Sequence, residues 1–100
     1  MIYIVWRFTA KPDRMTDFER HYNSEGSWAQ LFRRSPAFRG TTLLRDSSAP
    51  NRYLLWDCWD SLASFDRFKH EHGAEYAALD NQCEKLTEEE VNVGVFESVA

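Results

Sequence analysis

The stretch RYLLWDCWDSLASFDRF, residues 52–68, changes character halfway along. Residues 52–59 are aromatic or aliphatic at most positions, which favours a β-strand. Asp60 and Ser61 follow, and either side chain can cap the N-terminus of a helix. The stretch therefore predicts a strand that passes directly into a helix, and it places one acid, Asp57, inside an apolar strand.

Similar signals on both sides of this stretch predict the other elements. Residues 2–8 are β-branched and aromatic and predict a first strand, which leads into a helix that begins near Pro12 or Asp13. Gly40 marks a bulge or a close approach within a later strand. The remaining predicted elements are a short helix at 27–34, strands at 37–46 and 91–99, and a long helix whose apolar stripe runs from Leu62 to Leu86.

The predicted order βαββαβ indicates an α+β fold of the ferredoxin-like class, formed by residues 1–100 as a single domain. In that fold, a four-stranded antiparallel sheet carries its helices on one face. The other face would remain apolar, because Tyr3, Val5 and half of the third strand point toward it. An apolar face of this size usually marks an interface, so the sequence predicts a homodimer that packs sheet against sheet.

The overall composition limits the possible classes of function. The chain has 100 residues and a formal net charge of −4, so it lacks the basic surface that nucleic-acid binding requires. It has no apolar run of membrane-spanning length and no export signal, which predicts a cytoplasmic protein. Cys58 and Cys83 lack the spacing of a metal site and are expected to be reduced, small core residues. Neither a metal nor another cofactor is expected.

The chain resembles the antibiotic-biosynthesis-monooxygenase-like family of dimeric α+β barrels in two segments. In VWRFTAKPDRMTDFERHY, residues 5–22, a first strand runs through a Lys-Pro pair into a helix. In YLLWDCWDSLASFDRF, residues 53–68, a strand ends in Trp59 and is followed by an acid, a serine and a helix. The resemblance covers nearly the whole chain. It implies a dimeric barrel and a cofactor-independent oxidation of a small aromatic substrate, such as a phenol, a quinol or a polyketide-like compound.

The family also includes haem-degrading monooxygenases, which this chain resembles less. That branch has Asn in the first strand near the position of Trp6, where a tryptophan fills much of the space that a porphyrin needs. Trp59, in contrast, matches a residue that recurs in the pockets of the family. The resemblance therefore implies chemistry without haem, in which the substrate loses a proton and the resulting carbanion gives an electron to O₂.

Asp57 is the first candidate for a catalytic role. Strand alternation places it on the same face as Tyr53, Leu55 and Trp59. The family resemblance implies that Trp59 faces the helices, and Asp57 would then lie beneath them too. A carboxylate buried there must find a partner or hold a raised pKa. Two interpretations remain open: Asp57 is a structural group that pairs with an arginine or a backbone N–H, or it is an acid or base in a pocket.

Three further residues are candidates for catalysis. His72 and Tyr76 lie on the apolar stripe of the long helix, so both are expected to face the sheet unless a kink at Gly73 shifts the register beyond it. His72 is then either a base that forms an ion pair with Asp57 or a satisfied core residue. Arg45 or Tyr76 would stabilise an oxyanion, while the alternative for Arg45 is a surface salt bridge with Asp46 or Glu97.

Aromatic residues make up 15% of the chain and include four tryptophans. Trp6, Trp28, Phe32 and Trp59 are expected either to bind a flat aromatic substrate or to form plain core. The sequence thus leaves two hypotheses for function. The first is a cofactor-independent monooxygenase, and the second is a non-catalytic dimeric module that binds a small hydrophobic ligand or serves a stress response.

Overall fold

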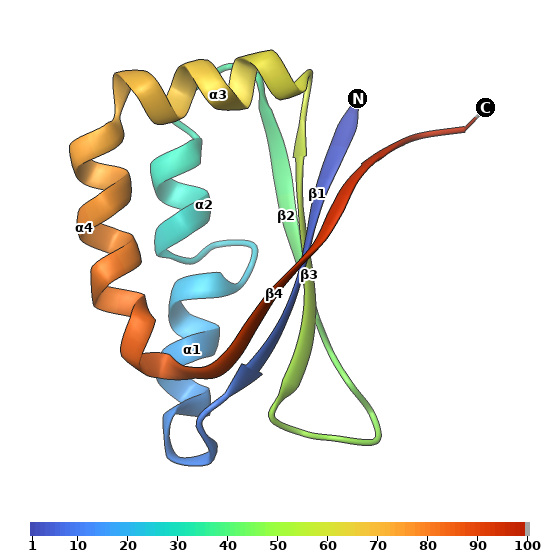
Figure 1. The fold of residues 1–100 in the computed structure, drawn as a ribbon, viewed down its shortest axis with the longest axis vertical. Helices are drawn as coiled ribbons and strands as arrows, with labels where there is room; N and C mark the ends of the chain where they lie inside the picture. The colour runs from blue at the N-terminus through green and yellow to red at the C-terminus, as the bar shows by residue number, and fades with distance from the viewer. Residues whose placement is uncertain (100) are drawn as a thin grey trace.

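The computed structural model describes residues 1–99, and its strands confirm the predicted α+β class (Figure 1). The strands are β1 (Ile2–Ala10), β2 (Phe38–Arg45), β3 (Arg52–Trp59) and β4 (Thr87–Glu97). All neighbouring pairs are antiparallel, and the spatial order is β2-β3-β1-β4. This order, with the first and third strands side by side in the centre, is that of the predicted ferredoxin-like fold.

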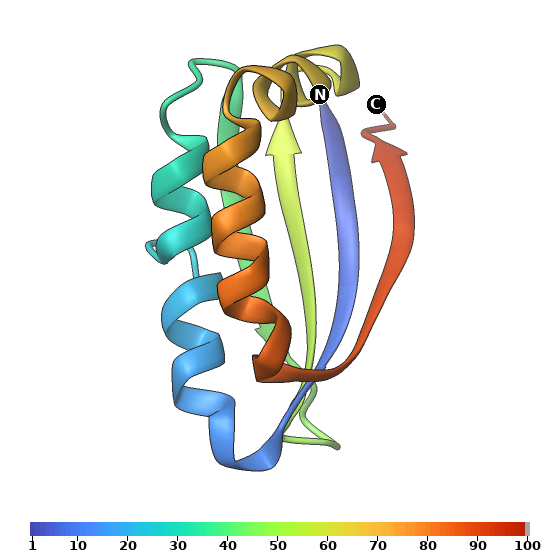
Figure 2. The same cartoon turned by 60° about the vertical axis from the view of Figure 1, so that its left-hand side comes forward.

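The helices lie on one face of the sheet, as predicted. They are α1 (Met15–Tyr22), α2 (Ser27–Phe32), α3 (Leu62–Glu71) and α4 (Gly73–Cys83), with short 3₁₀ turns η1 (Pro12–Arg14) and η2 (Glu84–Leu86). Figure 2 shows α1, α2 and α4 in front of the sheet and α3 across its end. In the same view no helix lies in front of β4, so the helical layer covers the inner face unevenly.

The long helix predicted between Leu62 and Leu86 is divided in two. α3 ends at Glu71 and α4 begins at Gly73, and His72 between them has non-helical angles of φ −118° and ψ 32°. Figure 1 shows α4 turning sharply away from α3 at this point. The apolar stripe therefore does not continue through the break, and His72 does not point the way that a single helix would direct it.

The alternation predicted for β3 is confirmed. Its inward side chains are at most 8% exposed, and they belong to Tyr53, Leu55, Asp57 and Trp59. The bulge predicted at Gly40 is also present, because the pairing of β2 with β3 shifts register there. Its φ of +129° is a conformation that glycine adopts without the steric cost of a side chain.

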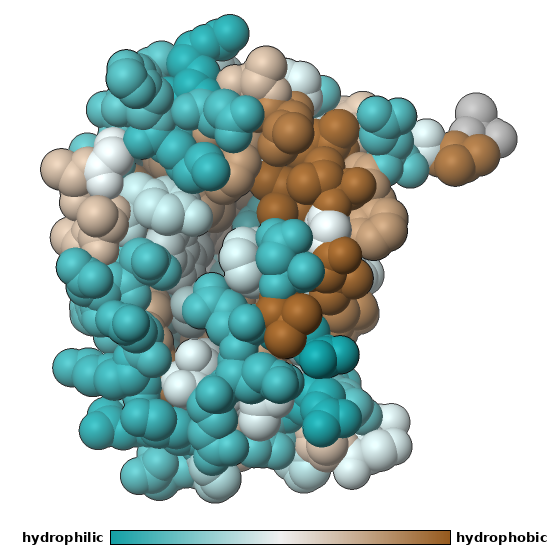
Figure 3. Space-filling model, viewed as in Figure 1, coloured by the Kyte–Doolittle hydropathy of each residue, from teal (hydrophilic) through white to brown (hydrophobic). Residues whose placement is uncertain are grey.

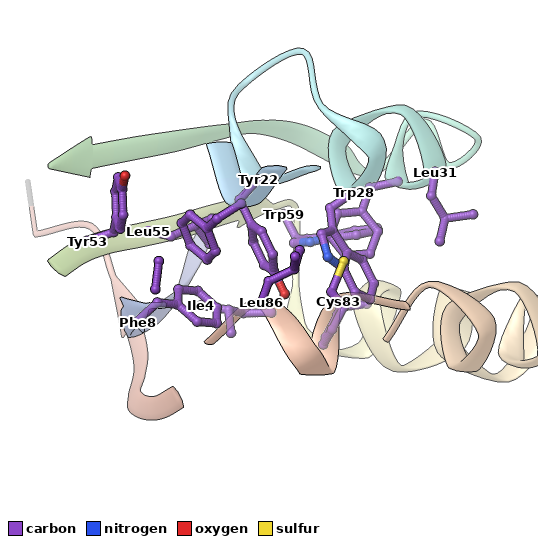
Figure 4. Packing of buried hydrophobic residues seen from close by; sticks show 14 of the residues in the cluster. Ile4, Phe8, Tyr22, Trp28, Leu31, Tyr53, Leu55, Trp59, Cys83 and Leu86 are labelled. Atoms are coloured by element: carbon purple, nitrogen blue, oxygen red, sulfur yellow. The ribbon is translucent and has the colours of Figure 1, made fainter. Parts of the chain in front are cut away.

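Aromatic rings form much of the core, as Figure 4 shows for part of the buried cluster. Trp59 has no exposed surface. Its ring centroid lies between 5.3 and 5.5 Å from those of four phenylalanines, Phe32, Phe38, Phe65 and Phe68. Close ring pairs of this kind add to the stabilisation from apolar burial, so this end of the core holds α2, α3 and the sheet together.

The two cysteines have different environments. Cys83 is 1% exposed and belongs to the core, as predicted. Cys58 points to the outer face of β3 and is partly exposed, so the core assignment was wrong for this residue, because strand alternation turns it away from the helices. Both are free thiols.

None of the helices within residues 1–99 has the length and apolar content needed to cross a membrane. The cytoplasmic location stays a prediction.

Exposed apolar side chains gather on β4 and on the outer face of the sheet. Val93, Val95 and Phe96 of β4 are 45 to 48% exposed. Phe96 also lines a shallow hollow on the outer face, together with Tyr3, Val5 and Trp56 of the neighbouring strands. Figure 3 shows apolar residues as a brown patch along the upper part of β4.

Candidate functional site

A cavity of about 200 Å³ lies between the sheet and the helices. In Figure 3 the surface is hollowed between the helical layer on the left and β4 on the right. Most of the lining is aromatic, and its polar groups come from three acids, two tyrosines and the indole N–H groups of two tryptophans. The lining residues are Trp6, Phe8, Tyr22, Trp28, Phe32, Leu55, Asp57, Phe65, Tyr76, Asp80 and Glu90.

Asp57 sits in the middle of the sheet wall of this cavity. It pairs with Ile4 of β1 on one side and with Thr41 of β2 on the other. The Thr41 hydroxyl donates a hydrogen bond of 2.6 Å to Asp57 Oδ1, whereas Oδ2 accepts none from residues 1–99. Burial raises the pKa of Asp57 to about 6, although the hydrogen bond from Thr41 acts in the opposite direction. Its partner is thus a hydroxyl, and neither an arginine nor a backbone N–H.

Tyr76 enters the same cavity from α4. Its ring meets the ring of Trp28 edge-on at 5.0 Å between centroids. Burial raises the pKa of the Tyr76 phenol to about 12, and the nearby acids Asp80, Asp57 and Glu90 add to this shift. Tyr76 therefore keeps its proton at neutral pH and is able to donate a hydrogen bond.

Three of the four predicted aromatic binding residues line the cavity: Trp6, Trp28 and Phe32. Trp6 also stacks on Phe8 of its own strand, with 6.1 Å between ring centroids and 18° between planes. Trp59 does not line the cavity. It lies in the core on the far side of Phe32, with which it makes an edge-on contact at 5.4 Å.

The predicted contact between Asp57 and His72 is not formed. His72 Nδ1 lies 3.3 Å from Glu75 Oε1, and the imidazole stacks on Phe68 at 4.6 Å between centroids. The side chain borders a different hollow, on the side of α3, with Arg34 among its other neighbours. The break between α3 and α4 causes the difference, because the prediction assumed one continuous helix.

Arg45 also lies away from the cavity. It forms an ion pair with Glu19 of α1, and the Tyr53 hydroxyl donates a 2.5 Å hydrogen bond to the same carboxylate. These two hydrogen bonds hold the pKa of Glu19 below its usual value. Arg45 pairs across the sheet with Tyr53, four residues before Asp57, which corresponds to about 13 Å along the strand. The surface ion-pair interpretation fits this position, but the partner is Glu19 and not Asp46 or Glu97 as predicted.

The sequence reasoning missed two acids of the lining, Asp80 and Glu90. Glu90 belongs to β4, which begins at Thr87 and not near Val91 as predicted. It lies opposite Phe8 in the ladder, so it faces the helices. Burial raises the pKa of Glu90, and the charges of Asp80 and Glu84 raise it further. No local signal in the sequence placed Glu90 inward, because its orientation follows from its pairing with Phe8 of β1.

The cavity can thus hold a flat ligand between aromatic walls, with the carboxylate of Asp57 and the phenol of Tyr76 among its polar groups. Asp57 offers a basic oxygen, and Tyr76 offers a donor. Within residues 1–99 no three His, Cys, Asp or Glu side chains lie close enough together to hold a metal ion.

Comparison with known proteins gives one family and several related structures. A sequence profile described as antibiotic biosynthesis monooxygenase matches residues 1–79. A mutant form of SnoaB, a cofactor-independent oxygenase from Streptomyces nogalater, is 25% identical with a TM-score of 0.80 over 97% of this chain and 91% of that one. No match was found among curated proteins.

Two other structures support the fold alone, since they are less than 25% identical. A provisionally assigned antibiotic biosynthesis monooxygenase from Bordetella bronchiseptica is 23% identical with a TM-score of 0.76, over 99% of this chain and 97% of that one. PA3566 from Pseudomonas aeruginosa is 16% identical with a TM-score of 0.70, over 99% and 94% of the two chains. Because the family profile spans more than three quarters of the sequence, the chain belongs to the antibiotic biosynthesis monooxygenase family.

Proposed function

We propose that this protein is a cofactor-independent monooxygenase that oxidises a small aromatic phenol, quinol or polyketide-like substrate. The observation that supports the proposal most directly is the environment of Asp57. Its carboxylate has a pKa of about 6, carries one oxygen without a partner in residues 1–99, and forms part of an aromatic cavity. A base with a pKa near the working pH is well suited to proton abstraction.

The reaction can be followed for anthrone, the keto tautomer of a polycyclic phenol, which carries an acidic CH₂ group. Asp57 accepts one proton from this carbon, and the carbanion gives one electron to O₂. The radical pair combines to form a C–O bond, and the peroxide anion takes the proton back from Asp57. Loss of water then leaves a carbonyl. One CH₂ group and one O₂ become one C=O group and one water, so no external reductant is needed.

Tyr76 and the aromatic walls would support this chemistry. The Tyr76 phenol, whose pKa is about 12, can donate a hydrogen bond to the oxyanion that forms when the substrate loses its proton. Trp6, Trp28 and Phe32 would hold the substrate flat between apolar faces.

The volume of the cavity bears on the size of the substrate. A dry protein cavity of about 150 Å³ accommodates benzene, so about 200 Å³ suits one or two fused rings. A third ring would extend through the open side toward β4.

The non-catalytic binding module remains the second candidate, and one observation favours it. The only histidine that was expected to act as a base, His72, faces a different hollow, so the chemistry would rest on Asp57 alone. The same cavity would then hold an aromatic ligand without changing it.

Oxygen uptake distinguishes the two functions. The protein is incubated with anthrone at pH 8 in air, while an oxygen electrode and the absorbance of anthraquinone are followed together. A monooxygenase is expected to consume one O₂ for each quinone formed, at a rate well above the spontaneous reaction. Binding of anthrone without any increase in oxygen uptake would instead support the non-catalytic module.

We also propose that the protein is a homodimer that packs the outer faces of two sheets together. The exposed side chains of Val93 and Phe96, and the hollow lined by Tyr3, Val5 and Trp56, support this arrangement. An apolar patch of this kind is rarely left in water on a monomer.

Phe96→Asp is expected to separate the dimer, because two carboxylates would be buried at the interface. Light scattering of the wild type at micromolar concentration should give twice the chain mass of 11.8 kDa, and the variant should give the chain mass. Leu62→Asp is a matched control, since Leu62 is 42% exposed but belongs to α3. A wild-type mass of one chain, or a dimer that survives the Phe96 substitution, contradicts the proposal.

A further inference from the structure

We propose that the cavity selects aromatic ligands that carry a protonated amine and rejects those that carry a carboxylate. This inference rests on the function proposed above, because it concerns the same cavity and names the class of substrate that it favours. It is carried by the charges of the lining and by the free oxygen of Asp57.

The polar lining contains acids, phenols and two indole N–H groups but no basic side chain from the described part of the chain. The acids are Asp57, Asp80 and Glu90. A cavity whose charges all have one sign sets up a potential that attracts the opposite charge and repels its own.

The pKa directions in the lining agree with this potential. Glu90 has a raised pKa, caused by burial and by the negative charges of Asp80 and Glu84. The pKa of Tyr76 is raised to about 12 by burial and by the charges of three acids of the lining. An ammonium group placed among these acids would relieve their mutual repulsion, whereas a carboxylate would add to it.

The three acids lie at different depths. Asp80 on α4 and Glu90 on β4 are exposed residues, so they stand at the open side of the cavity. Asp57 is 8% exposed and lies on the inner wall. A ligand that satisfies all three would bring a hydroxyl donor to Asp57 and a cation to the open side.

Asp57 supplies an observation that is independent of the overall charge. Thr41 holds Oδ1, while Oδ2 receives no hydrogen bond from residues 1–99 although the side chain is more than nine-tenths buried. Among residues 1–99 the fully buried side-chain nitrogen and oxygen atoms without a partner are the indole nitrogens of Trp28 and Trp59. Oδ2 of Asp57 therefore keeps some exposure at the wall of the cavity, where it still lacks a donor. A ligand with an O–H or N–H group would provide that donor, whereas an ionised acid could not.

The aromatic walls also suit a cation. Trp6, Trp28 and Tyr76 surround the cavity, and the faces of tryptophan and tyrosine rings attract ammonium groups. Aromatic walls with carboxylates at the opening thus form a site for an aromatic amine.

Three naphthalene compounds of similar size test the preference by calorimetry at pH 8: naphthylmethylamine, naphthylmethanol and naphthylacetate. The amine is expected to bind at least about tenfold more tightly than naphthylacetate, with the alcohol between them. The advantage of the amine should decrease when the salt concentration rises, because the acids at the opening are screened by ions.

Variants then assign the preference to the acids. Asp80→Asn and Glu90→Gln should each weaken amine binding about two- to fivefold and leave the alcohol unchanged. Glu97→Gln is the matched control, because Glu97 belongs to β4 but does not line the cavity. Equal binding of the amine and the acid, or a preference that survives both substitutions, overturns the inference.

The binding assay separates this inference from the proposed function. A preference for the amine in a protein that shows no oxygen uptake would uphold the inference and contradict the monooxygenase. Oxygen uptake with anthrone in a protein without any charge preference would do the reverse.

Discussion

Asp57→Asn is expected to stabilise the protein at pH 8 and to reduce the rate of anthrone oxidation at least about 100-fold. The loss of activity follows because an amide cannot accept the proton, and general bases typically contribute two to four powers of ten to a rate. The gain in stability follows because the substitution removes a buried charge while the amide oxygen can still accept the hydrogen bond from Thr41.

The sign of the pH dependence comes from the raised pKa of Asp57. The unfolded chain has an aspartate pKa of about 3.9, and the folded protein has a value of about 6. Between these values the folded state binds more protons than the unfolded state, so the wild type loses stability as the pH rises through this window. Above pH 6, the ionised Asp57 lowers the free energy of unfolding by its full amount, about 2–3 kcal/mol.

Chemical denaturation at pH 4 and pH 8 measures this difference. The free energy of unfolding of the Asn variant should exceed that of the wild type by about 2–3 kcal/mol at pH 8. At pH 4 the difference should be small, because the wild-type carboxyl is already protonated. Wild-type activity should rise with pH through about 6, as the base becomes ionised.

Asp60→Asn is the control for these measurements. Asp60 is exposed and forms a 2.5 Å ion pair with Arg39, which lowers its pKa. Its substitution should therefore bring no gain in stability at pH 8 and no loss of oxygenation. If Asp57→Asn is less stable than the wild type at pH 8, the carboxylate has a partner that stabilises it, and its role as a free base is wrong.

The position of Asp57 could be predicted because it depends on local rules. Strand alternation sets which side chains of β3 face the helices, and Ser61 caps α3 by accepting a 3.1 Å hydrogen bond from the Ser64 N–H. These features need only the pleat of a strand and the unsatisfied donors of a helix terminus. Alternation shows which side chains share a face, whereas the direction of that face came from the family resemblance through Trp59.

The position of His72 could not be predicted in the same way. The apolar residues from Leu62 to Leu86 recur every three or four positions, which fits one helix. In the structure the chain instead turns at His72, and α4 runs back along the sheet. Gly73, where α4 begins, is a local signal for a kink, but the periodicity of the segment alone does not show whether the helix breaks there. Glu90 shows the same limit, because its inward position follows from pairing with Phe8.

The two tryptophans at positions 59 and 6 provide the second large expected effect, since the structure gives them different roles. Trp59→Ala is expected to lower the free energy of unfolding by about 3–5 kcal/mol, because it removes a ring that has no exposed surface. A domain of this size has a total stability of about 5–15 kcal/mol, so this one change would remove a large part of it.

Trp6→Ala is expected to cost less stability, about 1–2 kcal/mol, since Trp6 is partly exposed at the wall of the cavity. Its main effect should be on ligand binding. Loss of the ring removes one aromatic face, which should weaken the binding of naphthylmethanol about two- to tenfold.

Urea denaturation and calorimetry together separate the two roles. Trp59→Phe is a useful second variant, because it keeps an aromatic ring among the four phenylalanines and should fold well enough for binding to be measured. It should lose stability but bind naphthylmethanol as the wild type does. If Trp59→Phe instead weakens binding more than Trp6→Ala does, Trp59 contacts the ligand directly. The cavity would then extend behind Phe32 when it is occupied, and the family resemblance that singled out Trp59 would describe the site better than the unliganded packing does.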